Sequence, residues 1–125
     1  MTDVAVVDYG AGNLMSIAQG LKRAGLTPEF VAKPPTNAEH DAAIIPGVGN
    51  YGQAMSRLSA FQDWLNSLIH SGIPILGICL GMQVLFEGSE ESQGAGLSVL
   101  SGRVVRLPRS MRVPHMGWNT IQARS

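Results

Sequence analysis

The chain has little charge, one cysteine and few aromatic residues among its 125 positions. Nine basic and nine acidic residues cancel to a net charge of zero, which argues against a surface for nucleic acid or membranes. A single cysteine cannot form a disulfide within the chain or a cysteine-based metal cluster. A chain without disulfides fits the reducing environment of the cytoplasm. We therefore expect a soluble cytoplasmic protein without metal, nucleic acid or membrane.

Long apolar runs and targeting segments are also missing. No apolar stretch reaches the roughly 18 residues that span a bilayer, and the opening MTDVAVVDYG lacks the basic and apolar regions of a signal peptide. The length suits one domain, so residues 1–125 are expected to form a single unit. Because only 14% of the residues are charged, some apolar surface is expected to be covered by a partner.

What the sequence does contain is an alternation of strand and helix patterns. Short apolar runs predict strands at 3–8, 28–32, 42–45 and 73–78, and helical spacing predicts helices at 14–24, 55–69 and 80–88. This order favours an α/β fold, a parallel sheet flanked by helices on both faces. Beyond it, a polar loop is expected at 89–98, a strand at 99–107 and a turn into another strand at 112–122.

The glycines of GVGNYG allow three interpretations. Gly47, Gly49 and Gly52 match the dinucleotide-binding pattern after a strand and before a helix. That pattern belongs on the first strand, however, where Met15 takes the place of the third glycine, and no acidic residue follows at the expected distance. The second interpretation is a loop that serves only as a tight turn. The favoured interpretation is an anion-stabilising loop whose backbone N–H groups build an oxyanion hole.

Cys79 lies in GICLG, where a predicted strand ends and a helix begins. This is the arrangement of a nucleophile elbow, a sharp turn that exposes the reactive side chain at the carboxyl end of the sheet. The helix N-terminus favours the thiolate, and the N–H of Leu80 is placed to donate to an oxyanion. The alternative is a buried cysteine that acts as a small hydrophobic residue.

Four segments together resemble the class I, triad-type glutamine amidotransferases. DYGAGNL, PGVGNYGQAM, GICLGMQVLFEGSEE and VPHMGWN follow one another in the family's order. The first and last of these narrow the resemblance to the glutaminase subunits of imidazole glycerol phosphate synthase, which act in histidine biosynthesis. The resemblance implies a flavodoxin-like α/β fold and no cofactor.

In that family the elbow cysteine attacks the carboxamide of glutamine, releases ammonia and forms a glutamyl thioester that water hydrolyses. By resemblance Cys79 is the nucleophile and Leu80 an oxyanion donor. The backbone of Gly47, Val48 and Gly49 is expected to give the second donor and to contact substrate. Gln83 and Glu91 are expected to bind the polar groups of glutamine, although a solvated loop is the plain alternative for Glu91.

The resemblance also implies a partner. These glutaminases form a heterodimer with a (βα)₈-barrel cyclase, which receives the ammonia. Asn13 and Trp118 lie in segments that face the cyclase in the family. Trp118, beside a glycine in a polar segment, suits an interface anchor as well as it suits a core position.

The chain departs from the family in its histidines. The family's base is a histidine followed two residues later by glutamate, nearer the C-terminus, and none of His40, His70 and His115 fits that pattern. His40 is expected to be solvated, and His70 to lie at the sheet edge opposite the elbow. We therefore expect a C-terminally incomplete family fold with negligible turnover alone. The rival interpretations are a non-catalytic module that docks to the cyclase and a dinucleotide-binding domain.

Overall fold

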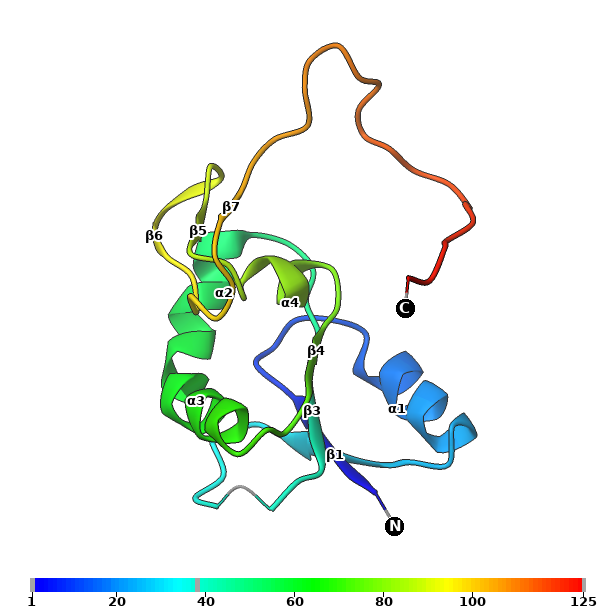
Figure 1. The fold of residues 1–125 in the computed structure, drawn as a ribbon, viewed down its shortest axis with the longest axis vertical. Helices are drawn as coiled ribbons and strands as arrows, with labels where there is room; N and C mark the ends of the chain where they lie inside the picture. Colours follow the sequence, from blue (N-terminus) through cyan, green and yellow to red (C-terminus); the bar gives the residue numbers. More distant parts are fainter. Residues whose placement is uncertain (1, 38, 125) are drawn as a thin grey trace.

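A four-stranded parallel sheet forms the centre of the computed structural model, which describes residues 2–37 and 39–124. Its strands lie in the order β2-β1-β3-β4 (Figure 1). Their bounds are β1 Asp3–Val7, β2 Thr27–Val31, β3 Ala42–Ile45 and β4 Ile75–Gly77. All three pairings are parallel, so the predicted α/β fold with a parallel sheet is confirmed.

Helices cover both faces of the sheet. The α1 helix, Leu14–Arg23, lies on one side, and α2 (Tyr51–Leu58), the 3₁₀ turn η1 (Ser59–Phe61) and α3 (Gln62–His70) lie on the other (Figure 1). The helix predicted at 55–69 therefore starts earlier and is interrupted. It begins at Tyr51 because the Asn50 side chain accepts a hydrogen bond from the Gln53 N–H at 3.0 Å. Among the residues described, no helix is long and apolar enough to cross a membrane.

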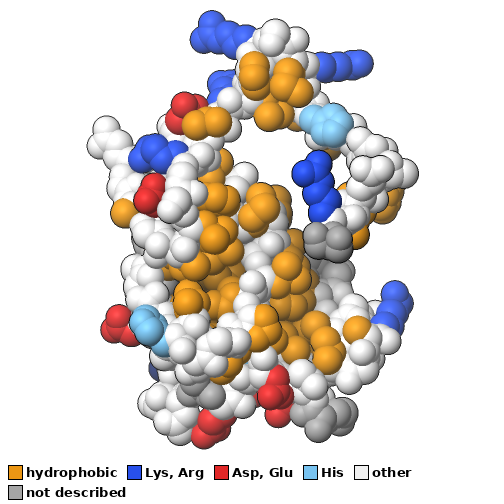
Figure 2. Space-filling view, viewed as in Figure 1, with side chains coloured by type: hydrophobic (Ala, Val, Ile, Leu, Met, Phe, Trp, Pro, Cys, Tyr) orange, Lys and Arg blue, Asp and Glu red, His pale blue; other side chains and the backbone are white. Residues whose placement is uncertain are grey.

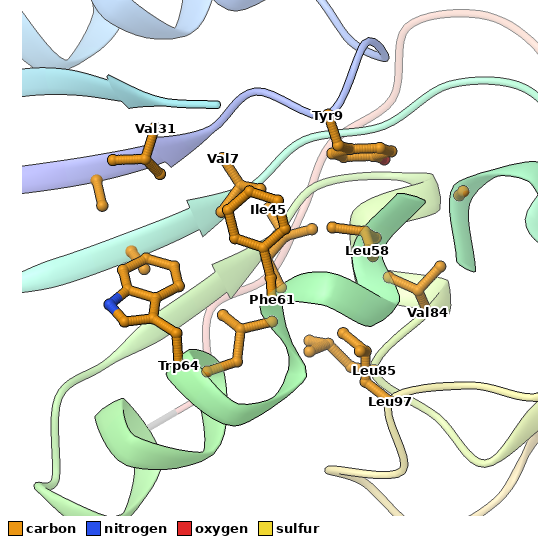
Figure 3. Close-up of a cluster of buried hydrophobic side chains, with 14 of the residues drawn as sticks. Val7, Tyr9, Val31, Ile45, Leu58, Phe61, Trp64, Val84, Leu85 and Leu97 are labelled. Carbon is orange, nitrogen blue, oxygen red and sulfur yellow. The ribbon is translucent and has the colours of Figure 1, made fainter. Parts of the chain in front are cut away.

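The hydrophobic core lies between the sheet and the α2–α3 side (Figure 3). Strand residues such as Val7 and Ile45 meet Leu58 and Trp64 of the helices there. Ile45, Leu58 and Val84 have no exposed surface, and β1 is buried from Val4 to Val7. Burial of these side chains from β1, β3 and α2–α3 fixes the carboxyl ends of the two inner strands.

The edge strand β4 is less well covered. Leu76 is 57% exposed, and Ile78 and Met82 beyond it are also exposed. Figure 2 shows apolar side chains gathered in the middle of the view, where Figure 1 places β4 and its neighbours. A shallow apolar pocket of about 220 Å³ on the α1 side is lined in part by Leu21, Leu26 and Leu76. This face of the sheet is therefore incompletely filled.

The second half of the chain differs from its predictions. The α4 helix, Leu80–Gln83, is shorter than the helix predicted at 80–88. The predicted loop at 89–98 contains strands, because β5 (Gly88–Ser89) pairs with β6 (Ser92–Ala95) and with β7 (Arg103–Val104). The strand predicted at 112–122 is wrong. Residues 105–124 run as an exposed arc without strand pairing (Figure 1), and a strand needs a hydrogen-bonded neighbour.

Candidate active site

Cys79 occupies a sharp turn between β4 and α4. Its backbone has φ 56° and ψ −116°, a conformation that costs a non-glycine residue about 1–3 kcal/mol and is concentrated at functional sites. Backbone hydrogen bonds hold the turn: Ile78 N–H donates to the Ile45 carbonyl at 2.9 Å, Gly81 N–H to the Ile78 carbonyl at 2.9 Å, and Met82 N–H to the Cys79 carbonyl at 3.0 Å. The thiol is exposed, so the alternative of a buried cysteine is wrong.

The glycines on either side of the cysteine are required by close backbone contacts. A methyl group built on Gly77 would lie 2.6 Å from the Gly81 carbonyl oxygen. A methyl group on Gly81 would overlap the Ile45 carbonyl of the neighbouring strand. Because real Cβ atoms do not approach backbone so closely, any side chain here would push α4 away from β3 and β4. The elbow geometry thus follows from the G-x-C-x-G sequence.

The loop after β3 packs against the elbow. The Cβ position of Gly47 lies 2.9 Å from the Gly81 nitrogen and 3.0 Å from the Leu80 Cβ. Within the described part of the chain, the N–H groups of Leu80, Val48 and Gly49 make no backbone or side-chain hydrogen bond. The carboxyl ends of β3 and β4 therefore present backbone donors that remain free to bind an oxygen atom.

Tyr9, which the sequence analysis did not single out, fixes this loop. Its hydroxyl donates to the Pro46 carbonyl at 2.5 Å, and the Arg57 guanidinium donates to the Tyr9 carbonyl at 3.3 Å. The pKa of Tyr9 is raised to about 12. Burial of the phenol is the larger cause, and the negative charge of the nearby Cys79 thiolate is the smaller one. Figure 3 shows the ring at the carboxyl end of the sheet. Its sequence signals are its position two residues after β1 and its place in DYGAGNL, one of the segments that carry the family resemblance.

Gln83 and Glu91 line one pocket of about 410 Å³. The N–H of Gln83 donates to the Cys79 carbonyl at 3.2 Å, so this residue lies one helical turn from the elbow. The Glu91 carboxylate accepts from the Asn50 side chain at 3.2 Å and from the Tyr51 N–H at 3.4 Å. The Glu91 side chain is exposed, but these two hydrogen bonds hold its carboxylate at the N-terminus of α2, where the helix dipole favours a negative charge. The two residues predicted to contact glutamine therefore line one pocket, whose lining residues do not include Cys79 or Gly47–Gly49.

The two residues expected at a partner interface are both exposed. Asn13 caps α1, where its side-chain oxygen accepts from the Ser16 N–H at 3.2 Å. Trp118 is fully exposed in the segment 105–124, so its alternative assignment to the core is wrong. No hydrogen bond among the described residues joins Asn13 and Trp118.

The described histidines are not bonded to the elbow. His40 is buried, which contradicts the expectation that it is solvated, because its Nε2 lies 2.8 Å from the Glu29 carboxylate and its ring packs edge-on against Trp64. The His70 Nδ1 lies 2.7 Å from the Asn66 carbonyl at the end of α3, and His115 is exposed. No hydrogen bond among residues 2–37 and 39–124 connects a histidine to Cys79.

The sequence of this chain is similar to those of known proteins. The family described as glutamine amidotransferase class-I matches residues 5–124. The chain is 44% identical over 119 residues to imidazole glycerol phosphate synthase subunit HisH of Methanothermobacter thermautotrophicus, and 48% identical over 123 residues to that of Synechococcus elongatus. These alignments cover 94% and 95% of this chain, but only 60% and 57% of those relatives. The chain thus spans about three fifths of their length.

Solved structures support the fold. A crystal structure described as glutamine amidotransferase superposes with a TM-score of 0.68 at 22% sequence identity, over 87% of this chain and 59% of that one. The structure of PurLQS from Thermotoga maritima gives a TM-score of 0.57 at 22% identity, over 67% of this chain and 42% of that one. At such identities the likeness concerns the fold alone.

Proposed function

We propose that Cys79 is the nucleophile of a glutaminase, because this chain belongs to the class I glutamine amidotransferases. One observation carries the proposal: the exposed thiol sits on a strained elbow whose next residues pack against Gly47 in the loop with free N–H groups. A nucleophile beside oriented backbone donors is the arrangement that acyl-transfer chemistry requires.

The proposed reaction begins with attack of the Cys79 sulfur on the carboxamide carbon of glutamine. A C–S bond forms, the C=O electron pair moves to oxygen, and the N–H groups of Leu80 and of Val48 or Gly49 stabilise that oxyanion. When the oxyanion collapses, the C–N bond breaks, and the nitrogen takes up the proton that the thiol gave up on attack and leaves as ammonia. Water then hydrolyses the glutamyl thioester, which gives glutamate and regenerates the thiol.

Substrate selection is assigned to the pocket next to the elbow. The Glu91 carboxylate would bind the α-ammonium group of glutamine, and Gln83 would hydrogen-bond its polar groups. The backbone of Gly47 would lie along the substrate, while a side chain at this position would overlap the Tyr9 hydroxyl and the start of α4. The shared pocket of Gln83 and Glu91 and the anchoring of Glu91 beside Asn50 support this assignment.

The proposed partner is a (βα)₈-barrel cyclase that binds this chain as a heterodimer and uses the ammonia to make imidazole glycerol phosphate in histidine biosynthesis. Identity of 44–48% to relatives named as subunits of that synthase supports the pairing. Asn13 and Trp118 are assigned to the interface. A fully exposed tryptophan supports that role, since tryptophans are common energetic anchors of interfaces. The single cysteine supports a cytoplasmic location.

For the 125-residue chain alone, we propose very slow turnover. The motivating observation is that no described histidine is hydrogen-bonded to Cys79, and a thiol attack followed by ammonia release needs a base and an acid. A rate of glutamate release of about 1 s⁻¹ or more, typical of enzymes, would contradict this. The same observation favours a second candidate function, a catalytically silent module that docks to the cyclase.

These candidates are separated by supplying the C-terminal portion of a HisH relative in trans and measuring ammonia and glutamate release. Restored release that is lost in Cys79→Ser supports the glutaminase. Inactivity of a complex that has demonstrably formed supports the docking module. The dinucleotide-binding alternative predicts quenching of tryptophan fluorescence by NAD, and the family match gives it no support.

A further inference from the structure

We propose that Tyr9 is a positioning residue for the oxyanion loop: its hydroxyl fixes the Pro46 carbonyl and thereby the backbone that faces the Cys79 elbow. This inference rests on the proposed glutaminase chemistry. It adds a residue from the loop after β1 to a site otherwise built from the ends of β3 and β4.

Tyr9 is anchored at both its ends. Its ring is buried, its hydroxyl makes a short hydrogen bond of 2.5 Å to the Pro46 carbonyl, and its own carbonyl accepts from Arg57 at 3.3 Å. A distance of 2.5 Å is at the short end of the range for O–H···O bonds. With the ring held by the core and the backbone held by α2, the hydroxyl acts as a fixed donor.

The hydroxyl and the elbow meet at the same glycine. A methyl group built on Gly47 would overlap the Tyr9 hydroxyl, and it would also lie 2.9 Å from the Gly81 nitrogen. The Pro46–Gly47 peptide is therefore held between Tyr9 on one side and the start of α4 on the other. Rotation of this peptide would move the N–H groups that follow it relative to Cys79.

Beyond Gly47 little else restrains the loop. Val48 is 63% exposed. Gly49 has φ +100° and no heavy atom within 4 Å of its Cβ position. Glycine pairs of this kind permit large backbone rotations. The Pro46 carbonyl is thus the last fixed point before the free N–H groups, and without the Tyr9 hydroxyl these donors would spend less time directed at the elbow.

The donor is available at neutral pH. Because burial and the neighbouring Cys79 charge raise the pKa of Tyr9 to about 12, the hydroxyl keeps its proton at and well above neutral pH. The tether therefore does not titrate during catalysis.

The test compares two alkylating agents on the full chain. A chloromethyl ketone analogue of glutamine and iodoacetamide both lose halide as the Cys79 sulfur forms a C–S bond, and the thiol proton goes to solvent. Both reagents carry a carbonyl next to the reacting carbon, but only the ketone has an amino-acid group that the pocket can bind, which would hold its carbonyl oxygen in the oxyanion loop. We expect Tyr9→Phe to slow labelling by the ketone about tenfold relative to iodoacetamide, measured by intact mass.

Tyr51→Phe is the matched control. Tyr51 is also a buried tyrosine, but its hydroxyl has no hydrogen-bond partner among the described residues, so the ratio of the two labelling rates should not change. If the ratio of the ketone labelling rate to the iodoacetamide labelling rate is the same in Tyr9→Phe as in the unmodified protein, the inference is overturned and the proposed function still stands. If the unmodified chain shows no preference for the ketone and no protection by glutamine, the proposed function fails, and this inference with it.

A second variant tests the same tether if Tyr9→Phe does not fold. Arg57→Met removes the hydrogen bond to the Tyr9 carbonyl while retaining an apolar stem on α2. We expect a smaller decrease of the ratio, two- to threefold, in the same direction. An unchanged ratio in this folded variant would count against the inference.

Discussion

The two faces of the sheet are packed differently. On the face covered by α2 and α3, core residues such as Ile45, Leu58 and Val84 have no exposed surface. On the face covered by α1, an apolar pocket remains beside β4, and Leu76 is 57% exposed. The same short sheet thus combines a close-packed side with a side that leaves apolar surface in contact with water.

The candidate site belongs to the close-packed side. Tyr9, Ile45 and Leu80 are members of the buried cluster, so the elbow and the oxyanion loop are held by the core. Asn13 and Trp118, assigned to the partner, lie in exposed segments. The difference indicates that the proposed nucleophile and oxyanion donors are held in place within this chain, whereas the surfaces assigned to binding are its less packed parts.

The strongest test of this contrast is a pair of glycine substitutions. Gly81→Ala places a methyl group on the Ile45 carbonyl, while nothing lies within 4 Å of the Cβ position of Gly20 in α1. We expect Gly81→Ala to lower the free energy of unfolding by about 4 kcal/mol or more, or to prevent folding. Gly20→Ala should raise it by up to about 1 kcal/mol. Urea unfolding measures both, and a Gly81→Ala loss below about 1 kcal/mol would contradict the elbow packing.

Two leucines compare the faces directly. Leu58→Ala empties a fully buried position on the α2 side and should cost about 2–5 kcal/mol. Leu76→Ala removes a side chain that is 57% exposed, and should cost less than about 1 kcal/mol. Equal losses in chemical denaturation would show that the two faces are packed alike.

The pKa of Tyr9 gives a third comparison. A value of about 12 in the folded chain, against the ordinary 10.0, means that the unfolded state loses its proton first as pH rises. The stability due to this group is therefore intact below pH 10 and falls between pH 10 and 12, by about 1.4 kcal/mol at pH 11.

Tyr9→Phe cannot show that loss. The difference in unfolding free energy between the unmodified protein and Tyr9→Phe should therefore shrink by this amount from pH 8 to pH 11. The contributions of Tyr51 and of the other titrating groups are the same in both proteins and cancel in this difference. A difference that stays constant over this range would place the Tyr9 hydroxyl in solvent.

The smallest expected effect on stability is that of Trp118→Ala. Because this side chain is fully exposed, its removal should change the unfolding free energy by less than about 0.5 kcal/mol. Binding to a cyclase subunit, measured by calorimetry, should weaken by at least about 2 kcal/mol if the tryptophan anchors the interface. Asn13 needs a different substitution, Asn13→Ser, which keeps the α1 cap.

Local patterns predicted the parts of the fold that depend on neighbouring residues. The apolar runs predicted the strands of the sheet, and G-x-C-x-G predicted the turn at Cys79, because both follow from short-range geometry. The Asn50 cap shifted the start of α2 to Tyr51. No local pattern distinguished the isolated stretch 112–122 from a paired strand.

Contacts between distant residues were harder to predict. The link from the Tyr9 hydroxyl to the Pro46 carbonyl spans 37 positions, and the pairing of His40 with Glu29 joins a loop to β2. Each depends on how the strands are placed side by side, which residue types alone do not specify. The positions of the proposed glutamine contacts were found only through the family resemblance.

The most direct test of the proposed chemistry is protection of Cys79 by glutamine. The chloromethyl ketone analogue is added to the intact chain with increasing glutamine or, separately, glutamate, and labelling of Cys79 is followed by peptide mass. We predict that glutamine slows labelling in a saturable way, that glutamate does so much less, and that Cys79→Ser is not labelled. Labelling that is indifferent to glutamine, or that persists in Cys79→Ser, would contradict the assignment of this elbow as a glutamine-directed nucleophile.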